Sequence, residues 1–414
     1  MRIMMLSQWF EPEPTFKGLA FAKELVRRGH QVEVLTGFPN YPGGKLYPGY
    51  RMRLWQRECI DGIAVLRVPL YPSHGRSVLG RIVNYTSFAF SASLGSVFVA
   101  RPDLVYVYHP PATIGLAALA AKMLHRVPIV YDIQDLWPDS VATSGMMGNR
   151  RILDMLYRWC QLIYRKSERI VVLSPGFKAT LVERGVAEEK IEVIYNWCDE
   201  RALGASDGQP VVLGAPGEFT VLFAGTMGVA QALDTVLDAA RICMDAVPRA
   251  RFVLIGGGID HARLERRATE MKLTNLRFLP RQSGSEIGRY LSAADVLLVH
   301  LRKEPLYRIT IPSKTQAYLA AGKPILMAVE GDAAALIQRS RAGLTCTPNS
   351  PDSLAEAVAE LASFSVERLN EMGQAGHDFY LRELSLAVGA DRFERVFAAA
   401  LMDATAARVA TSAR

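Results

Sequence analysis

The chain has 414 residues, which is too long for one ordinary hydrophobic core and favours two domains of roughly 200 residues each. Half of the residues are hydrophobic and 21% are charged, and this balance excludes a disordered, collagen-like or coiled-coil protein. The net charge is +7, and residues 1–200 hold 24 basic against 18 acidic side chains, which indicates an anionic partner: nucleic acid, a phosphorylated metabolite or a membrane.

Short apolar runs alternate with segments of helical periodicity along the first half of the chain. This alternation is typical of a parallel α/β sheet. We predict strands at 3–10, 31–36, 63–69, 104–109, 129–133, 170–174 and 191–195. We predict helices at 18–28, 112–124, 152–166 and 177–183. The first run has no small-residue cleavage site after it, so we expect a strand there and not a signal peptide.

The turn after the first strand lacks the G-x-G-x-x-G sequence of dinucleotide binding, which weakens an NAD hypothesis. It still leads to the crevice at which open α/β sheets bind ligands. Gly18 and the helix amides after it could meet a phosphate, and the alternative is an ordinary connecting loop.

Residues 82–100 carry no charge, yet they include six polar side chains, which is too many for a membrane-spanning helix. One hypothesis is a helix packed on the N-terminal sheet. The other is a helix that lies partly in a membrane interface, helped by Arg76 and Arg81 just before it.

Carboxylates and a Trp lie at the carboxyl end of the predicted strand 129–133, and His109 ends its neighbour. Asp132, Asp135 and Asp139 could hold sugar hydroxyls, and Trp137 could stack on a sugar ring. The alternative is a helix cap with a structural Trp. A metal is disfavoured, because no His or Glu clusters with these carboxylates.

Residues 199–218 are rich in Gly and Pro and are the best candidate linker. Beyond it we predict strands at 220–225, 251–255, 276–279, 296–300 and 325–328, helices at 232–244, 262–271, 313–321 and 354–362, and a helical tail. The predicted division is a Rossmann-like domain at 1–200, a second at 201–384 and a helical tail at 385–414.

Glycine-bearing turns follow two strands of the second domain, at 225–228 and 255–258. A strand, such a turn and a helix N-terminus together can bind an anion, although each can also be merely a turn. Four cations then surround the helix start at Pro312: Arg302, Lys303, Arg308 and Lys314. Ser313 is placed to cap that helix, and the cations would suit a diphosphate, with a solvated basic loop as the alternative.

Five cysteines, odd in number and without a C-x-x-C pair, argue against a disulfide framework and for a reducing cytoplasm: Cys59, Cys160, Cys198, Cys243 and Cys346.

With these motifs in order, the chain resembles the retaining glycosyltransferases of family four, in particular the bacterial exopolysaccharide and O-antigen branch typified by colanic acid and fucosamine transferases. The resemblance rests on LTGFPNYPGG, DIQDLWPDS, YNWCDE, FAGTMGVAQALDTVLDAA and PSKTQAYLAAGKPIL, at 35–44, 132–140, 195–200, 223–240 and 312–326. It implies a GT-B fold, in which two Rossmann-like domains face a cleft and C-terminal helices cross back to the N-terminal domain. It also implies transfer with retention, without a metal or another cofactor, in which basic side chains stabilise the leaving diphosphate.

The sequence departs from the family pattern at several site positions. Thr226 stands where the family has an Arg, and Ala230 or Gln231 stands near its Lys. The paired glutamates fall on Arg308 and Gln316, of which Gln316 could accept from ribose hydroxyls. Tyr106 and Tyr108 occupy the His-x-His positions of the family, and His109 follows directly after Tyr108.

From the residues and the resemblance together we expect three groups of site residues. The catalytic group is Arg308, Lys314, His109 and Asp135. The donor-binding group is Gly18, Gly225, Thr226, Gly228, Gln231, Gly257, Arg281, Arg302, Ser313 and Gln316. The acceptor-binding group is Lys17, Asp132 and Trp137.

The resemblance implies transfer of a sugar, such as an N-acetylated or deoxy hexose, from a UDP-linked donor to an undecaprenyl-diphosphate saccharide in surface polysaccharide synthesis. The protein would be peripheral, at the cytoplasmic face of the bacterial inner membrane. An anionic membrane explains the N-terminal basic surplus better than nucleic acid does, and the docking face would combine 82–100 with Arg51, Arg53, Arg57, Arg76, Arg81, Arg150 and Arg151. The alternatives are a GT-B nucleotide-sugar epimerase and a non-catalytic two-domain protein that binds a nucleotide-sugar.

Overall fold

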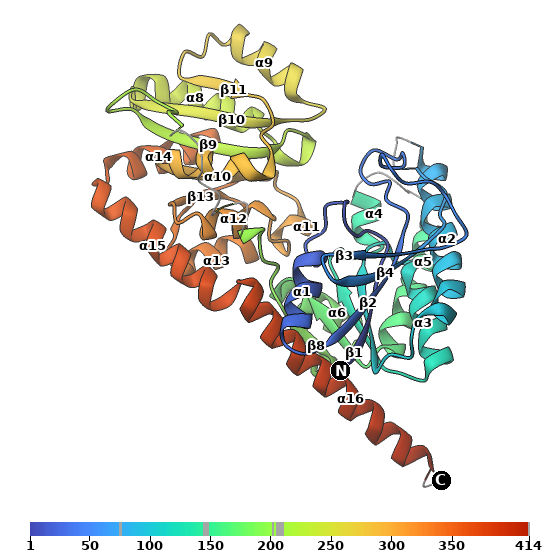
Figure 1. The fold of residues 1–414 in the computed structure, drawn as a ribbon. Helices are drawn as coiled ribbons and strands as arrows, with labels where there is room; N and C mark the ends of the chain where they lie inside the picture. Colours follow the sequence, from blue (N-terminus) through green and yellow to red (C-terminus); the bar gives the residue numbers. More distant parts are fainter. Residues whose placement is uncertain (74–76, 144–148, 201–202, 204–210, 413–414) are drawn as a thin grey trace. The chain divides into compact units, whose positions relative to one another are not determined.

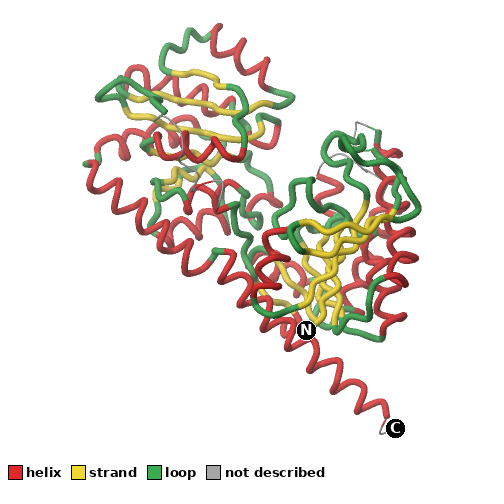
Figure 2. Tube along the Cα trace, in the orientation of Figure 1, coloured by secondary structure: helices red, strands yellow, loops and turns green. Residues whose placement is uncertain are grey.

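The computed structural model describes residues 1–73, 77–143, 149–200, 203 and 211–412 (Figure 1). The chain forms two compact units: Met1–Tyr195 with Gly389–Arg414, here unit 1, and Asn196–Val388, here unit 2. Residues 201–202 and 204–210 of the Gly- and Pro-rich linker predicted at 199–218 lie outside the described residues, as does Arg76. In each unit the strands lie among helices, which Figure 2 shows in yellow and red.

Unit 1 has an eight-stranded sheet of order β3-β4-β2-β1-β5-β6-β7-β8. Its strands are β1 (Arg2–Ser7), β2 (Gln31–Gly37), β3 (Gln56–Ile60), β4 (Ile63–Val68), β5 (Leu104–His109), β6 (Ile129–Ile133), β7 (Arg169–Val172) and β8 (Ile191–Val193). All neighbours pair in parallel except β3, which is antiparallel to β4. The strand prediction missed β3, although Asp61-Gly62 at the hairpin turn, both with positive φ, is a strong local hairpin signal.

Helices cover both faces of this sheet. They are α1 (Leu19–Arg27), α2 (Val78–Gly95), α3 (Ile114–His125), α4 (Asp139–Thr143), α5 (Arg150–Lys166), α6 (Pro175–Glu183) and the 3-10 turns η1 (Ser96–Phe98) and η2 (Glu188–Lys190). In Figure 1, α2, α3 and α5 lie on one face and α1 on the other. The helix predicted at 82–100 is present as α2 and begins four residues earlier than predicted. Ser77 caps its start, because the Ser77 side chain accepts a hydrogen bond from the Gly80 amide.

The last helix, α16 (Leu386–Ser412), packs from residue 389 onward on the same face as α1. The Phe393 ring lies 4.9 Å from the ring of Phe21 and 5.4 Å from that of Tyr106, measured between centroids. Arg28 pairs with Glu394 at 2.8 Å. An aromatic contact and ion pairs thus attach this helix to the unit 1 sheet.

Unit 2 has a six-stranded, fully parallel sheet of order β11-β10-β9-β12-β13-β14. Its strands are β9 (Phe219–Thr226), β10 (Ala250–Gly257), β11 (Leu276–Leu279), β12 (Val296–His300), β13 (Ile325–Ala328) and β14 (Gly343–Thr345). Its helices are η3 (Val229–Gln231), α8 (Asp234–Ala246), α9 (His261–Glu270), α10 (Gly284–Ala293), α11 (Pro305–Arg308), α12 (Lys314–Ala320), α13 (Asp332–Ser340), α14 (Pro351–Ser363) and α15 (Val366–Glu383). The prediction missed α10, α11, α13, β14 and the 3-10 turn η3.

Both sheets are doubly wound, so the α/β prediction is confirmed. In unit 1 the strand order reverses between β1 and β5, and in unit 2 between β9 and β12. Connections leave the sheet in opposite directions at such a point, which opens a crevice at the carboxyl ends of the strands. These two crevices are where functional side chains are expected.

Two glycines of unit 2 test how tightly α15 packs. A Cβ added at Gly373 would lie 2.1 Å from the Gly322 carbonyl oxygen, whereas one added at Gly284 would meet nothing within 4 Å. We expect Gly373→Ala to lower the free energy of unfolding by about 1–3 kcal/mol, because the backbone at Gly322 must shift. Gly284→Ala should leave it nearly unchanged. Urea unfolding followed by circular dichroism measures both, and equal midpoints would contradict the close contact.

Candidate functional site

The strand ends at the unit 2 crevice approach each other through glycines. A Cβ at Gly256 would lie 1.9 Å from the Gly225 carbonyl oxygen, and one at Gly258 would lie 2.2 Å from that of Met227. All three glycines 225, 256 and 258 have φ values between +142° and +152°, which L side chains rarely adopt. The glycines at 256 and 258 therefore serve the packing of β9 against β10, while the expectation that a ligand approaches at Gly257 stays a prediction. A Cβ at Gly257 would meet nothing within 4 Å.

Lys314 lies at the centre of this crevice. Its Nζ is 3.5 Å from the centroid of the Phe223 ring, and a Cβ added at Gly225 would lie 2.9 Å from that Nζ. The residue is partly exposed at the helix start, but Nζ is buried and has no hydrogen-bond partner among the described residues. Burial lowers the pKa of Lys314 to about 7. The aromatic face offsets only part of the cost of this buried cation.

His300 ends β12 beside Lys314. Its Nδ1 is 2.7 Å from the Gln231 carbonyl oxygen, and because that oxygen can only accept, Nδ1 carries the proton. Burial lowers the pKa of His300 to about 4, and the hydrogen bond from Nδ1 opposes this while the charge of Lys314 adds to it. The neutral ring leaves Nε2 as a buried acceptor without a partner among the described residues. The sequence analysis left His300 out of the site, although its place at a strand end pointed to it.

Arg302 continues the crevice past β12. Its amide donates to the Ala230 carbonyl oxygen at 2.9 Å, which ties this loop to η3, and its guanidinium pairs with Glu304 at 3.0 Å. Arg302 Nε is buried and finds no partner within the part of the chain that the structure describes. The structure thus gathers seven side chains and turns at one sheet edge: Gly225, Thr226, Gly228, Gln231, His300, Arg302 and Lys314.

Several predicted donor-side residues lie differently. Ser313 makes no capping hydrogen bond to any described residue, which corrects the predicted cap. The buried Gln316 side chain makes a different contact at this turn: with its nitrogen turned inward, it donates to the carbonyl oxygens of Ser313 at 2.8 Å and Pro312 at 3.1 Å. Arg281 is exposed after β11, which β10 separates from β9.

Arg308 lies at the end of α11 and is largely exposed. Its Nε is 3.7 Å from a Glu330 carboxylate oxygen, and Lys303 Nζ is 3.2 Å from the other. Arg308 lines a cavity of about 420 Å³ beside the ends of β13 and β14, and Lys314 is not among the residues that line it. The structure therefore does not bring Arg308 and Lys314 into one cavity.

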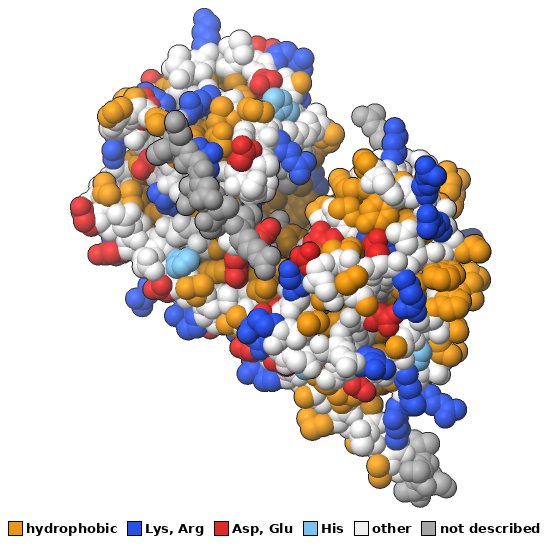
Figure 3. All heavy atoms as spheres, viewed as in Figure 1, with side chains coloured by type: hydrophobic (Ala, Val, Ile, Leu, Met, Phe, Trp, Pro, Cys, Tyr) orange, Lys and Arg blue, Asp and Glu red, His pale blue; other side chains and the backbone are white. Residues whose placement is uncertain are grey.

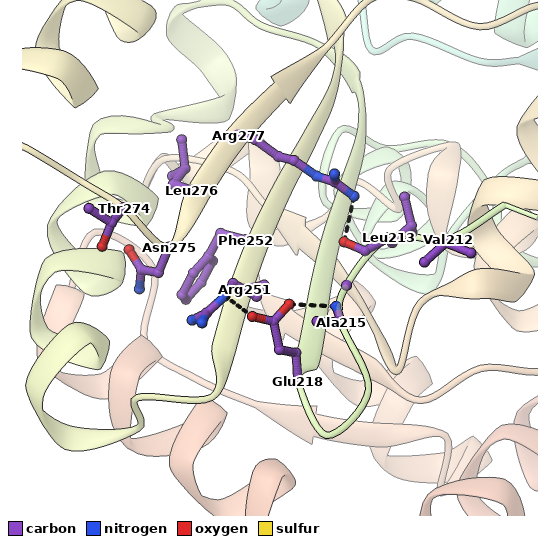
Figure 4. Close-up of a pocket in the computed structure, with 11 residues that line it drawn as sticks. Val212, Leu213, Ala215, Glu218, Arg251, Phe252, Thr274, Asn275, Leu276 and Arg277 are labelled. Carbon is purple, nitrogen blue, oxygen red and sulfur yellow. Dashed lines mark hydrogen bonds and ion pairs between the residues drawn. The ribbon is translucent and has the colours of Figure 1, made fainter.

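A cavity of about 370 Å³ lies at the amino ends of the unit 2 strands (Figure 4). Its charged side chains are satisfied locally: Glu218 pairs with Arg251 at 2.6 Å and accepts from the Ala215 amide at 2.7 Å, and Arg277 donates to the Leu213 carbonyl oxygen. Because ligands of parallel sheets bind at the carboxyl ends, we do not assign the nucleotide to this cavity.

In unit 1 the predicted acceptor residues Lys17 and Asp132 form a fully buried ion pair of 2.7 Å. The Tyr106 hydroxyl and the Gln134 amide also donate to Asp132, each at 2.6 Å. Burial lowers the pKa of Lys17, and Asp132 opposes that shift. Lys17 Nζ lies 4.9 Å from the Phe393 ring centroid. These contacts correct the expectation of direct acceptor contact: the pair joins the loop after β1 to β6 and α16.

His109 and Trp137 are also buried. Burial lowers the pKa of His109 to about 3, so its ring is neutral, and its Nδ1 has no partner among the described residues. Its ring centroid lies 5.6 Å from that of Tyr131 and 6.0 Å from that of Trp137. A histidine of this kind is a poor proton acceptor near neutral pH.

Asp135 is an exposed residue at this edge, but burial of its carboxyl group raises the pKa of that group to about 6, and two tyrosines that the sequence analysis missed face it. Burial raises the pKa of Tyr41, and the charge of Asp135 raises it further. Burial also raises the pKa of Tyr85; the charge of Arg81 opposes this shift and that of Asp135 adds to it. The Trp9 ring stacks on Tyr41 at 4.7 Å. Tyr41 lies in the LTGFPNYPGG segment, so that motif was the available signal.

Glu13 holds the Tyr41 loop in place. Its carboxylate accepts from the amides of Asn40 and Tyr41 at 2.7 Å and of Phe10 at 3.2 Å. Burial raises the pKa of Glu13 to about 7 against these hydrogen bonds.

Among the described residues, no group of three or more His, Cys, Asp and Glu side chains could hold a metal, and no helix is long and apolar enough to cross a membrane.

Two family models match the chain. A glycosyl transferase 4-like domain matches residues 19–197, and a glycosyl transferases group 1 model matches residues 218–363. "Probable glycosyltransferase WbjE" of Pseudomonas aeruginosa is 26% identical over 292 residues, which are 69% of this chain and 72% of the relative. "Putative colanic acid biosynthesis glycosyl transferase WcaI" of Escherichia coli (strain K12) is 26% identical over 346 residues, 80% and 84% of the two chains.

A solved structure with the same fold is that of Anabaena Alr3699/HepE in complex with UDP, with a TM-score of 0.67 and 15% identity over 96% of this chain and 100% of that one. The structure of WaaG, a glycosyltransferase involved in lipopolysaccharide biosynthesis, has a TM-score of 0.62 and 15% identity, over 95% and 99% of the chains. At this identity the likeness concerns the fold.

The buried Lys17–Asp132 pair predicts an asymmetry between two lysines. Lys17→Met leaves the Asp132 carboxylate buried and short of a partner, so we expect the free energy of unfolding to fall by about 3–5 kcal/mol. The matched control is Lys23→Met, which breaks the exposed pair Lys23–Asp61 of 2.8 Å and should cost at most about 1 kcal/mol. Chemical denaturation measures both, and a Lys17 variant as stable as the control would refute the structural role.

The unpartnered Lys314 Nζ predicts a pH-dependent stability. Its folded pKa of about 7 lies below its ordinary value of 10.5, so between these values the unfolded chain binds more protons and the free energy of unfolding rises with pH. Lys314→Met should raise Tm at pH 6, by the equivalent of about 1–3 kcal/mol, and this advantage should shrink by pH 9. Exposed Lys303→Met is the control. Scanning calorimetry at both pH values tests this, and an advantage that is absent or independent of pH would contradict it.

Proposed function

We propose a specific reaction for this chain, which belongs to the GT-B glycosyltransferases of family four, with a glycosyl transferase 4-like domain followed by a glycosyl transferases group 1 domain. The proposed reaction is transfer of a sugar, with retention and without a metal, from a UDP-sugar to a lipid-linked saccharide. The observation that carries the donor half is the buried Lys314 Nζ at the unit 2 crevice, which lacks a hydrogen-bond partner among the described residues.

A diphosphate at this edge would satisfy the polar atoms that the protein leaves open. An anionic oxygen beside Lys314 Nζ would supply its missing partner and favour its charged form. A hydroxyl of the nucleotide or sugar could donate to His300 Nε2, which no described residue engages. Arg302 would add a second cation. The structure of HepE, a protein of the same fold, was determined in complex with UDP, and this supports UDP as the nucleotide of the donor.

The chemistry that we propose depends on electrostatic positioning. The bond from the sugar C1 to the diphosphate oxygen breaks, the acceptor oxygen bonds to C1 on the same face, and the departing phosphate takes the acceptor proton. Cations that stabilise the developing diphosphate charge supply most of the rate. A neutral His109 is compatible with this route, because no histidine has to remove the proton, and Asp135 would orient the acceptor hydroxyl with Tyr41 and Tyr85.

A catalytic role of Arg308 would require its side chain to move. Its guanidinium is exposed and faces Glu330, so it would have to leave that weak ion pair to reach a phosphate. Within unit 2 the geometry therefore favours Lys314 and Arg302 over Arg308 as the residues that meet the leaving group.

For the acceptor we propose an undecaprenyl-diphosphate saccharide in exopolysaccharide or O-antigen synthesis, with the enzyme peripheral at the cytoplasmic face of the inner membrane. The name of the relative WcaI, which mentions colanic acid biosynthesis, supports the polysaccharide role. The Asp135 carboxyl group, whose charge acts on the hydroxyls of Tyr41 and Tyr85, offers hydrogen bonds to sugar hydroxyls, as a saccharide acceptor requires.

Nucleotide binding tests the donor assignment. We expect UDP to raise Tm more than GDP, CMP or dTDP. A ligand at 100 times its Kd adds about 2.7 kcal/mol to stability, so binding of the preferred nucleotide is measurable as a shift in Tm. Lys314→Met should weaken UDP binding by roughly 10-fold to 100-fold, the equivalent of one charge-assisted hydrogen bond, and Arg302→Ala by a similar factor. The control is Arg368→Ala, which removes an exposed cation of α15.

If Lys314→Met bound UDP as tightly as the wild type, the donor assignment would be wrong. Activity is measured as transfer from radiolabelled UDP-sugars to a lipid-linked acceptor. Consumption of the donor without any acceptor would instead indicate epimerisation or hydrolysis, and tight binding without turnover would indicate a binding protein.

A further inference from the structure

Helix α2 exposes a stripe of apolar side chains, which the exposed Thr86 interrupts between Val83 and Phe90. Leu79, Phe90 and Leu94 are 71%, 68% and 65% exposed, and Val83 lies between them on the same side of the helix. The spacings of four, seven and four residues place all four side chains within one face. Val97 in η1 extends the stripe, which is about 27 Å long at 1.5 Å per residue.

The opposite face of α2 is apolar as well, since Tyr85, Phe88, Ala89 and Ala92 are buried in unit 1. A helix that is apolar on two faces normally has both covered. Among the described residues of unit 1, none covers the outer face. Exposed apolar area of this extent marks an interaction surface.

A second segment continues the stripe. The Trp55 ring stacks on Phe98 at 6.2 Å with an interplanar angle of 27°, and the Arg57 guanidinium donates to the Phe98 carbonyl oxygen. Just before Trp55, the residues Arg51, Met52, Arg53 and Leu54 are all exposed. We call the combined surface the α2 face: Leu79, Val83, Phe90, Leu94, Val97, Phe98, Leu54, Trp55, Arg51 and Arg53.

The charges on the α2 face have one sign. Residues 45–57 contain four cations and no carboxylate. Arg57 pairs with Glu33 at 3.0 Å, whereas no ion pair engages Arg51 or Arg53 within the part of the chain that the structure describes. Figure 3 shows orange apolar side chains along the edge of unit 1 that carries α2, with blue Lys and Arg side chains next to them.

We propose that the α2 face docks unit 1 on an anionic lipid bilayer, with α2 lying in the plane of the interface. Apolar and aromatic side chains can enter the headgroup boundary there, while Arg51 and Arg53 meet the lipid phosphates. A second copy fits the face less well, because a two-fold interface would set this cationic surface against itself.

Docking in this way would orient the acceptor side of the unit. Arg81 and Tyr85 lie on the inner side of α2, where the charges of Arg81 and Asp135 both act on the Tyr85 hydroxyl. Arg81 Nε is buried, and no described residue accepts from it. The helix thus has its outer face for lipid and its inner face toward Asp135. This inference rests on the proposed lipid-linked acceptor and names the surface that would present it.

Vesicle sedimentation tests the proposal. The full chain should bind phosphatidylglycerol-containing vesicles, bind pure phosphatidylcholine vesicles less, and lose affinity with added salt. Phe90→Ser combined with Leu94→Ser should weaken binding by about tenfold or more, and Arg51→Ser with Arg53→Ser should remove most of the preference for anionic lipid. The matched control, Val366→Ser with Met402→Ser, removes two apolar side chains that are each 67% exposed elsewhere and should bind as the wild type does.

Two results would overturn the proposal. One is that the Phe90/Leu94 variant still binds vesicles as the wild type does. The other is that gel filtration with light scattering shows a concentration-dependent dimer that only this variant loses, which would make a second copy the occupant. Circular dichroism confirms that the variants are folded. The UDP-induced shift in Tm is measured without vesicles and should be unchanged in them. Loss of that shift in the wild type would therefore count against the donor assignment and not against membrane docking.

Discussion

The parallel pairing of strands in both sheets is the constraint on which the rest of the molecule depends. Parallel strands bring all of their carboxyl ends to one edge, and the reversal of strand order beside β1 and beside β9 opens a crevice at that edge. Each crevice therefore collects side chains that lie far apart in the sequence. In unit 1, Lys17 contacts Asp132, which lies 115 positions away in the sequence. In unit 2, Lys314 lies beside Gly225 at the carboxyl end of β9.

These two lysines show how the same cost is met in different ways. Burying an ammonium group is unfavourable unless a partner compensates it. Lys17 has the Asp132 carboxylate at 2.7 Å and serves the fold, because it ties β1, β6 and the last helix together. Among the described residues Lys314 has only the face of Phe223, and the neighbouring His300 Nε2 is also unpartnered there. An uncompensated polar pair that is retained at a crevice is better explained by a ligand than by stability.

Local patterns predicted the order of elements well, because apolar strand runs and helical periodicity depend on neighbouring residues. Among the elements missed, two have short signals: β3, which the Asp61-Gly62 turn indicates, and β14, which has three residues. The helices α10 and α13, of 10 and 9 residues, were missed as well. Site residues were harder. Proximity to a strand end predicted that Lys17, Asp132 and Lys314 would lie at the crevices, but whether each is paired or open depends on partners such as Tyr106 and Phe223. Ser313 looked like a cap by residue type, yet its side chain makes no capping hydrogen bond to a described residue.

The N-terminal basic surplus can now be divided by what each charge contacts. Arg28, Arg67 and Arg169 are held by carboxylates of unit 1 and serve its packing, as the pairs with Glu394, Glu58 and Asp403 show. Arg51 and Arg53 have no such carboxylate among the described residues and stand beside the exposed stripe of α2. A net charge alone does not distinguish these uses, since it sums satisfied and unsatisfied groups. Only the unsatisfied ones can attract an anionic surface strongly, and Arg51 and Arg53 are placed next to the exposed apolar face that a bilayer would cover.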